Sequence, residues 1–167
     1  MSMILTVRRL GDPDLLRLRE HPELVADYLG EDPPDGFGPF ADIDVDKAWH
    51  AIHFLLTHTA WEGAPPLNFV VTGGTEVGDA LGYGPARGFT SAEVRLVADA
   101  LEALTPDVLL QRFDPAALTA AEIYPQTWDR PPEEDDTRGY VADYFDQLRS
   151  FVIDAAAAGE AMLISLT

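Results

Sequence analysis

The chain of 167 residues carries 29 aspartates and glutamates but only 11 lysines and arginines, so its formal net charge is −18, and it contains no cysteine. Such a charge repels nucleic-acid phosphates and anionic membrane surfaces, so we expect neither as a partner. Without cysteine the chain forms no disulfide framework, zinc finger, iron–sulfur centre or cysteine nucleophile. The length is typical of a single domain, and a hydrophobic content of 47% is enough for a buried core.

A strand and two short helices are predicted at the N-terminus. Residues 3–10 are rich in aliphatic side chains and predict a strand. Asp12 and Pro13 are typical of a helix N-cap followed by a helix-starting proline. Pro22 would break the interior of one long helix, so we expect it to start a second helix, which Gly30 ends.

The clearest helical period of the chain follows a loop. Residues 31–41 are rich in proline, glycine and aspartate and predict a surface loop. Over residues 44–58 apolar side chains recur with the spacing of one helix face, at Val45, Ala48, Trp49, Ile52, Leu55 and Leu56. On such a helix Asp46, His50 and His53 would be neighbours beside the buried face, and we call these three residues the polar seam.

A glycine-rich segment occupies the middle of the chain. Residues 67–72 predict a buried strand, and the glycine-rich stretch 73–88 follows it. This stretch has neither the glycine spacing of a dinucleotide-binding turn nor the Gly-Lys-Ser/Thr of a P-loop. Gly82 and Gly84 allow backbone turns that could hold Arg87 in a fixed position. A fixed guanidinium binds a carboxylate or phosphate through two bonds, and an ion pair with one of the chain's own carboxylates is an equal alternative.

Helix caps and periodicity predict the elements of the C-terminal half. Thr90 and Glu93 have capping-box spacing, and Thr105-Pro106 and Asp114-Pro115 each start a short helix. Residues 124–136 predict an irregular segment, 141–155 a strongly amphipathic helix, and 161–166 a terminal strand.

These elements together predict the α+β class. Three strands among six or seven helices, without regular strand–helix–strand alternation, predict a single compact domain over residues 1–167. In it several helices pack on a small mixed sheet that includes the N- and C-terminal strands. The chain has no apolar run long enough for a signal peptide or a membrane span, so we expect it in the cytoplasm.

Three kinds of chemistry fit the polar seam. Its imidazoles and carboxylate could bind a transition metal, Asp46 could orient His50 as an acid–base pair, or the histidines could form a pH-sensitive surface. The structural alternative is that both histidines are hydrogen-bonded at the edge of the core. Zinc is disfavoured because the glutamate of zinc proteases is missing. Calcium is rejected because Lys47 stands where an EF-hand loop needs glycine. We therefore predict no metal and no cofactor.

Three motifs follow one another along the chain. They are Asp46-Lys47-Ala48-Trp49-His50-Ala51-Ile52-His53, then Gly82-Tyr83-Gly84-Pro85-Ala86-Arg87, then Ile123-Tyr124-Pro125 followed by Trp128. In this order and spacing the chain resembles, over essentially its whole length, the YfbM-like family of bacterial proteins, a domain of unknown function named DUF1877. The resemblance implies a single α+β domain of the bacterial cytoplasm, and it implies no established activity, cofactor or catalytic residue.

The polar seam and the loop around Arg87 are the two motif-rich parts of the chain. We hypothesise that they meet in one cleft, which gives six candidate ligand-binding residues: Asp46, His50, His53, Tyr83, Arg87 and Trp128. The aromatic side chains would be walls of this cleft, while packing over the core is the alternative for Trp128. No serine or cysteine nucleophile motif accompanies them, so no catalytic residue is predicted.

Two functional classes and one structural alternative follow. The leading hypothesis is a non-catalytic binding or interaction protein, for example an immunity-like protein whose acidic surface speeds association with a basic partner. The alternative is a protein or enzyme that binds a small anionic ligand, with Arg87 as anchor and an imidazole as acid or base. In the third, both motifs only maintain the fold. The sequence does not decide whether any catalysis occurs.

Overall fold

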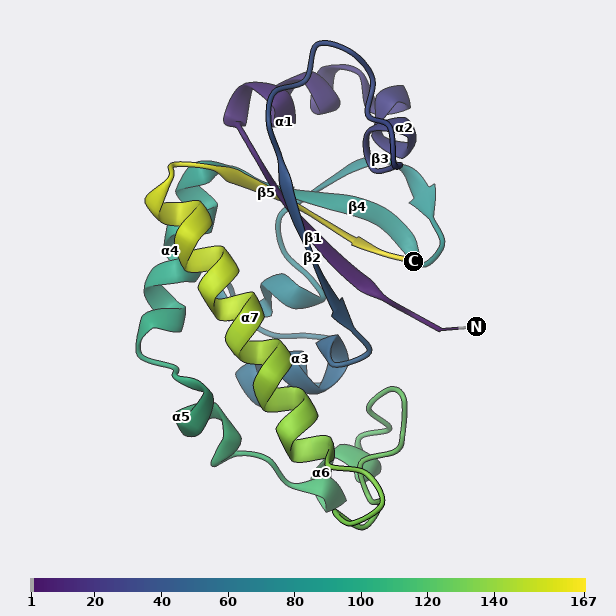
Figure 1. Cartoon of the computed structure of the whole chain (residues 1–167), viewed down its shortest axis with the longest axis vertical. Coiled ribbons are helices and arrows are strands. Elements are labelled where there is room, and N and C mark those ends of the chain that lie inside the picture. The colour runs from purple at the N-terminus through teal and green to yellow at the C-terminus, as the bar shows by residue number, and fades with distance from the viewer. Residues whose placement is uncertain (1) are drawn as a thin grey trace.

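A five-stranded sheet forms the centre of the fold, which a computed structural model describes for residues 2–167 (Figure 1). The strands are β1 (Leu5–Leu10), β2 (Ala41–Asp46), β3 (Thr75–Leu81), β4 (Gly84–Phe89) and β5 (Ala161–Leu166). They lie in the order β2-β1-β5-β4-β3, and every neighbouring pair is antiparallel. The α+β class and the inclusion of both terminal strands are confirmed, but the sheet is antiparallel throughout and therefore not mixed.

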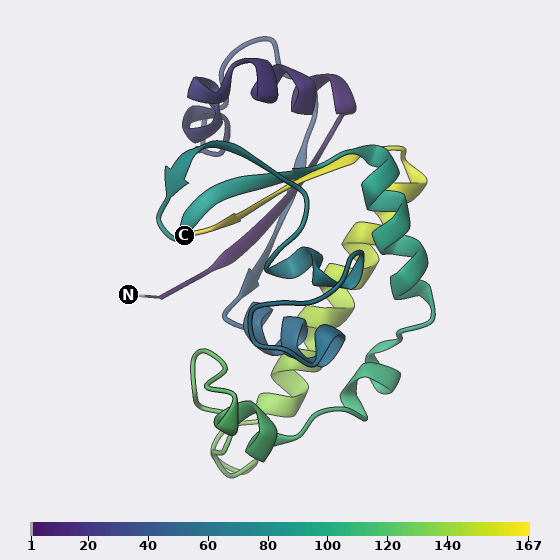
Figure 2. The ribbon, with the colours of Figure 1, turned by 180° about the vertical axis from the view of Figure 1, so that it is seen from behind.

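Helices cover both faces of this sheet (Figures 1 and 2). The α-helices are α1 (Asp12–Glu20), α2 (Val25–Tyr28), α3 (Trp49–Thr57), α4 (Ser91–Glu102), α5 (Pro106–Leu110), α6 (Pro115–Ala120) and α7 (Thr137–Ala157), and the 3₁₀ helices are η1 (Pro22–Leu24) and η2 (Leu67–Val70). Helices α1 and α2 pack on one face, and α3, α4 and α7 pack on the other.

Strand β5 shows how the two layers share the sheet. Met162 and Ile164 join the larger apolar cluster with α3, α4 and α7, whereas Ala161 and Leu163 join the smaller cluster with α1 and α2. Successive side chains of a strand point to opposite faces, so a strand covered on both sides must be apolar at every position. This explains the uninterrupted apolar run near the end of the sequence.

The helix predicted for residues 44–58 begins only at Trp49. Residues 41–46 form β2, the edge strand that pairs with β1. The segment Asp42-Ile43-Asp44-Val45-Asp46 alternates polar and apolar side chains, as a half-buried strand does, and this period prevails over the helical one. Asp46 has a φ of 50° where the chain leaves the strand, so it does not share a helix with His50 and His53.

Two further elements differ from the prediction. Residues 67–72 do not form a strand, because Leu67–Val70 is the 3₁₀ helix η2. The glycine-rich stretch is not a loop but the β3–β4 hairpin, with an irregular register between Val77 and Ala80. Gly78 lies in that irregularity at a φ of 80°, a backbone conformation that favours glycine. The high glycine content of this segment is therefore why its two strands were not predicted.

The predicted caps of the later helices are confirmed. Thr90 and Glu93 make both hydrogen bonds of the capping box, and the side chains of Thr105 and Asp114 cap α5 and α6. Asp12 is not the N-cap of α1, because Gly11 holds that position. The carboxylate of Asp12 instead accepts hydrogen bonds from the backbone N–H, at 2.9 Å, and the hydroxyl of Ser91, which ties α1 to the start of α4.

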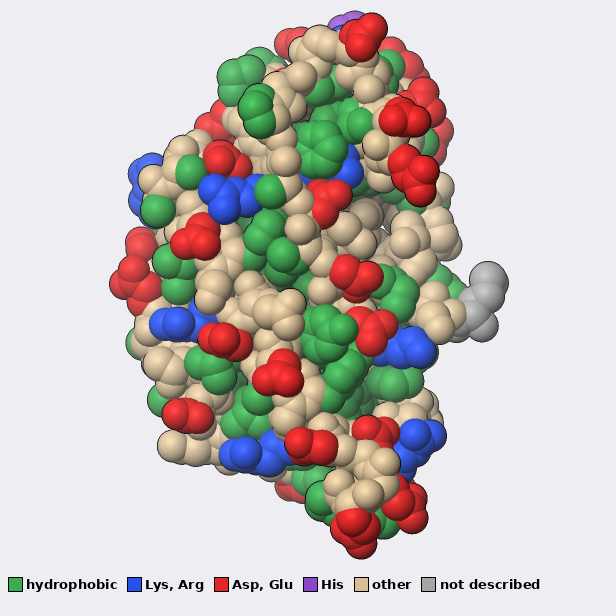
Figure 3. All heavy atoms as spheres, in the orientation of Figure 1, with side chains coloured by type: hydrophobic (Ala, Val, Ile, Leu, Met, Phe, Trp, Pro, Cys, Tyr) green, Lys and Arg blue, Asp and Glu red, His purple; other side chains and the backbone are tan. Residues whose placement is uncertain are grey.

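Acidic side chains are more common than basic ones on the surface. Figure 3 shows aspartates and glutamates spread over the face that carries α7 and β2, with fewer basic side chains between them.

None of the helices in residues 2–167 has the length and apolar character needed to cross a membrane.

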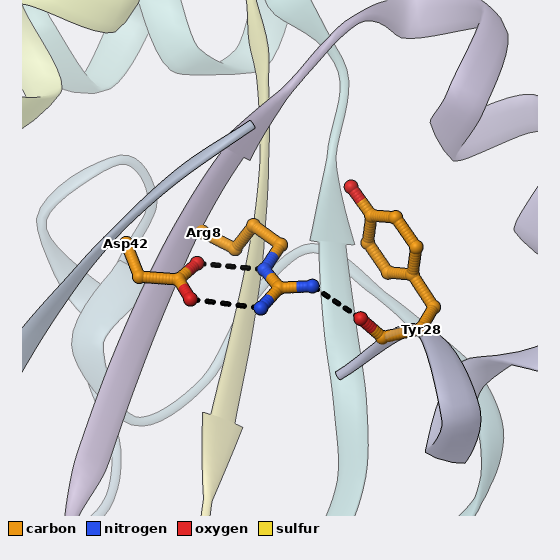
Figure 4. A network of polar contacts seen from close by, with 3 residues as sticks. All are labelled: Arg8, Tyr28 and Asp42. Atoms are coloured by element: carbon orange, nitrogen blue, oxygen red, sulfur yellow. Dashed lines mark hydrogen bonds and ion pairs between the residues drawn. The ribbon is translucent and has the colours of Figure 1, made fainter. Parts of the chain in front are cut away.

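A buried arginine joins β1, β2 and the end of α2 (Figure 4). Arg8 Nε and Nη2 donate to the two carboxylate oxygens of Asp42 at 2.6 and 2.8 Å, and Nη1 donates to the backbone carbonyl of Tyr28. The guanidinium also lies 3.9 Å from the ring centroid of Phe40 and 4.9 Å from that of Tyr28. These contacts attach the loop of residues 31–41 to the sheet.

Candidate functional site

The six candidate residues lie in three places. Tyr83 and Arg87 line one pocket, Asp46 and Trp128 line a separate depression at the start of α7, and His50 and His53 are wholly buried on α3 and line neither. The structure therefore does not bring the six together in a single cleft. Their ligand-binding role stays a prediction.

His50 is hydrogen-bonded at both ring nitrogens. Nε2 lies 2.8 Å from the carbonyl oxygen of Ala60, and Nδ1 accepts the backbone N–H of Tyr124 at 2.9 Å. These partners select the neutral tautomer with its proton on Nε2, and burial lowers the pKa of the imidazole. The ring stacks on Trp49, with centroids 4.8 Å apart. This arrangement matches the structural alternative, a hydrogen-bonded histidine in the core.

His53 is wholly buried with one nitrogen unsatisfied. Its Nε2 lies 3.4 Å from the hydroxyl of Thr57, and within residues 2–167 its Nδ1 has no hydrogen-bond partner. Burial lowers the pKa of His53 to about 4; the backbone carbonyl of Glu62 opposes only part of this effect, and the positive charge of Arg87 adds to it. A neutral imidazole is therefore the folded form at neutral pH.

The buried His53 makes stability depend on pH. In the unfolded chain its pKa returns to about 6.5, so the unfolded state binds the proton first as pH falls. We expect wild type to lose up to about 3 kcal/mol relative to His53→Leu between pH 6.5 and pH 4. Urea unfolding of both proteins at several pH values measures this difference.

The exposed His58 supplies the control for this effect. His58 has a φ of 62°, which asparagine tolerates, so His58→Asn removes an imidazole without changing the core. Its stability should follow that of wild type at every pH. Parallel stability curves for His53→Leu and wild type would contradict a depressed pKa at His53.

Arg87 is a hydrogen-bond donor to a run of backbone carbonyls. Its Nη1 lies 3.0, 2.6 and 3.1 Å from the carbonyl oxygens of Phe69, Thr72 and Gly73, and its Nη2 lies 2.7 Å from that of Val70. The guanidinium thus holds the end of η2 and the turn into β3. The predicted ion pair with an internal carboxylate is not formed among residues 2–167.

The charge of Arg87 is poorly solvated. Burial lowers the pKa of its guanidinium to about 10, and the carboxylate of Glu76 on the neighbouring strand offsets only part of that effect. Carbonyl oxygens accept its protons but carry no negative charge. A desolvated cation without a paired carboxylate favours an anion beside it.

Arg87 opens into a pocket of about 210 Å³. The other residues that line it have apolar or aromatic side chains: Leu5, Trp49, Trp61, Val70, Val71, Tyr83, Pro85, Ile164 and Leu166. Trp49 is buried, whereas Trp61 is 55% and Tyr83 41% exposed. The residues come from the sheet, η2 and the start of α3, so segments far apart in the sequence form one pocket.

A tight turn presents Tyr83 to this pocket. Tyr83 lies between the last residue of β3 and the first of β4, and its N–H donates to the carbonyl of Leu166 at 3.2 Å. Gly82, at a φ of 32°, lies so near the backbone of Thr167 that a Cβ would be 3.0 Å from its Cα. Glycine at position 82 therefore lets the hairpin pack against the C-terminal strand.

Asp46 and Trp128 have structural partners of their own. The hydroxyl of Tyr140 donates to a carboxylate oxygen of Asp46 at 2.8 Å and accepts the backbone N–H of Lys47 at 3.0 Å. Burial, together with this bond to Asp46, raises the pKa of Tyr140. Trp128 is wholly buried, and its Nε1–H donates to the carbonyl of Ile123 at 2.9 Å, so it packs in the core at the base of that depression.

Trp61 was not among the predicted site residues. It lies in the loop after α3, where neither periodicity nor a cap distinguishes an exposed tryptophan from a buried one. Its place becomes visible only through contacts, because its ring centroid lies 4.3 Å from that of His50 and 6.1 Å from that of Trp49.

Metal ligation receives no support, since no three histidine, aspartate or glutamate side chains of the described chain are grouped to hold an ion.

Comparisons with known proteins agree with the fold and name no activity. The crystal structure of a protein of unknown function, YfbM from Escherichia coli, is similar with a TM-score of 0.72 and 24% sequence identity, covering 98% of this chain and 99% of that chain. No curated protein matches the sequence. The family model described as a domain of unknown function, DUF1877, matches residues 1–165. The chain therefore belongs to the DUF1877 family.

Proposed function

We propose that this protein binds a small organic anion, without catalysis, in the pocket beside Arg87. The observation that carries the proposal is that Arg87, which lines the pocket, has a poorly solvated guanidinium with no paired carboxylate in residues 2–167, although the chain has 29 acidic residues. The contacts of Arg87 with neutral carbonyls explain its role in the fold but do not neutralise its charge, which leaves an anion favourable beside it.

The bonds of Arg87 leave it able to bind a ligand. Its four carbonyl contacts involve Nη1 and Nη2, and within residues 2–167 Nε has no acceptor. An anionic group in the pocket would supply the missing negative charge, and charge-assisted hydrogen bonds are about twice as strong as neutral ones. The same contacts fix the guanidinium in place before the ligand arrives, which lowers the entropic cost of binding.

The lining of the pocket favours binding over catalysis. Tyr83 and Arg87 are its only ionisable side chains in the described part of the chain. General acid–base catalysis needs a group that titrates near the working pH and reaches the substrate. His50 and His53 could have served, but both lie outside the lining, and His50 uses both nitrogens for structural bonds.

Matched pairs of anions and neutral analogues test the proposal. We expect benzoate or cyclohexanecarboxylate to raise the melting temperature, whereas benzamide and cyclohexanecarboxamide should not. At one hundred times its dissociation constant a ligand adds about 2.7 kcal/mol, or about 5 to 10 °C for a chain of this size. The proposal is wrong if neither carboxylate changes the melting temperature, or if each amide acts as strongly as its acid.

A basic protein partner is the second candidate, supported by the charge distribution. Only four side-chain ion pairs occur in residues 2–167, so most of the acidic groups spread over the surface in Figure 3 have no counter-charge. Such a surface speeds association with a basic protein and makes it sensitive to salt. Affinity capture from a native lysate should recover a stoichiometric basic partner at low salt and lose it at high salt. Recovery of no stoichiometric partner at low salt would argue against this function.

A further inference from the structure

The pocket beside Arg87 has an aromatic entrance. Six large hydrophobic side chains are exposed in residues 2–167: Leu16, Phe40, Trp61, Tyr83, Leu96 and Val108. Of these, only Trp61 and Tyr83 line the pocket of Arg87. Exposed aromatic surface beside a pocket costs solvation free energy that folding does not recover, and it is typical of a ligand site.

Both entrance residues are held by fixed neighbours. Tyr83 lies on the turn that its N–H ties to Leu166. Trp61 follows Ala60, whose carbonyl is bonded to His50, and precedes Glu62, whose carbonyl accepts the hydroxyl of Thr59 at 2.7 Å. Because the backbone at both positions is already held in place, only the side chains lose conformational entropy when a flat ligand stacks on them.

Trp49 continues this aromatic surface into the protein. Its indole is buried, lies 6.1 Å from Trp61 between ring centroids, and lines the same pocket. Its Nε1–H donates to the carbonyl of Met3 at 3.0 Å, so its polar atom is satisfied and the ring presents an apolar surface. The pocket is therefore lined by the exposed rings of Trp61 and Tyr83, the buried ring of Trp49, and the cation of Arg87.

The size and polarity of the pocket narrow the class of ligand. A volume of about 210 Å³ is smaller than the roughly 300–1,000 Å³ of sites for drug-sized molecules. The single cation provides for one anionic group, and the rest of the lining is aromatic or aliphatic. A nucleotide, with its sugar and several charges, does not match this lining.

We propose that the anion bound beside Arg87 is a planar aromatic acid of one or two rings, whose ring stacks on Trp61 and Tyr83 while its carboxylate faces Arg87. This rests on the proposed function, and it adds that the aromatic entrance selects flat ligands over saturated ones of equal charge. Aromatic pairs contribute about 0.5–1.5 kcal/mol beyond the area they bury, which corresponds to a preference of about two- to tenfold.

Two acids of equal charge and nearly equal size give the test. Benzoate is planar and aromatic, and cyclohexanecarboxylate is neither. Calorimetric titration of wild type should give a dissociation constant about fivefold lower for benzoate. Trp49 and Trp61 line this pocket and Trp128 does not, so the fluorescence change on titration with benzoate should come from Trp49 and Trp61, and Trp61→Leu should reduce it. Trp61→Leu and Tyr83→Leu should each reduce the preference for benzoate, whereas Leu96→Ala, an exposed apolar residue outside this pocket, should keep it.

The possible outcomes separate the two proposals. Equal binding of both acids by wild type overturns the aromatic selection and leaves the anion-binding function standing. A preference for benzoate that survives in both Trp61→Leu and Tyr83→Leu overturns the assignment of the entrance. Binding of neither acid overturns both proposals. Because Trp61 and Tyr83 are exposed, their variants should fold. A circular dichroism spectrum of each variant that matches that of wild type verifies this before titration.

Discussion

Replacing Arg87 with leucine is expected to lower the free energy of unfolding by about 3 kcal/mol, because several partly buried carbonyls lose their donor. The guanidinium contacts four carbonyl oxygens, those of Phe69, Val70, Thr72 and Gly73. No other side chain in the described residues donates to these four oxygens, so leucine leaves a turn of backbone unsatisfied. Urea unfolding monitored by circular dichroism measures the loss.

Arg87→Lys is the matched control, because it keeps the charge and loses the planar geometry. A lysine ammonium is a point charge that cannot reach four carbonyls in the same arrangement, so we expect Arg87→Lys to recover only part of the loss. A leucine variant within about 0.5 kcal/mol of wild type would mean that water satisfies the four carbonyls, and that Arg87 is not needed for the fold.

Because Arg87 also holds part of the pocket wall, replacing it does not test ligand binding alone. A loss of affinity in Arg87→Ala would combine a missing anchor with a disordered pocket wall, since Val70 both accepts a bond from Arg87 and lines the pocket. Trp61 and Tyr83, which are exposed, allow the two effects to be separated. The neutral amides test the charge of Arg87 without altering the protein.

Local signals predicted the elements whose determinants are close in sequence. Thr90 and Glu93 are three residues apart and form their capping box as expected, and the periodic residues 141–155 lie within α7. Each of these depends on neighbours along the chain, so the pattern contains the information needed.

The failures occurred where two local patterns compete or where distant contacts decide. Residues 41–46 fit both a helix and a strand, and pairing with β1 selects the strand. The role of His50 depends on the backbone N–H of Tyr124, 74 positions away, and no spacing along one helix reveals such a partner. Arg87 was found as a candidate from its motif, but its carbonyl partners depend on a 3₁₀ helix that was predicted as a strand.

The first two of the three family motifs nevertheless contribute to one place in the fold. His50 does not line the pocket, but it bonds to Ala60, next to Trp61, and stacks on Trp49. Tyr83 and Arg87 line the same pocket from the other motif. The motifs are thus related through the aromatic wall, rather than through a catalytic pair of histidines.

Asp42→Asn is expected to lower the free energy of unfolding by about 2–3 kcal/mol, because it leaves the guanidinium of Arg8 buried without its counter-charge. The side chain of Arg8 is only 5% exposed, whereas that of Asp42 is 35% exposed. The loss should therefore be smaller than the 3–5 kcal/mol typical of a fully buried pair. Chemical unfolding of wild type and the variant measures it.

A double-mutant cycle shows whether the loss belongs to the pair. Arg8→Met removes the buried charge, and once it is absent Asp42→Asn should cost little, so the two substitutions should couple by about 2 kcal/mol. Phe40 and Tyr28 cover the guanidinium, so we expect 1 M salt to weaken this coupling far less than it would weaken an exposed pair. Additive losses, or a coupling that high salt abolishes, would show that Asp42 acts as an ordinary surface carboxylate and that the aromatic rings and the Tyr28 carbonyl are enough to hold Arg8.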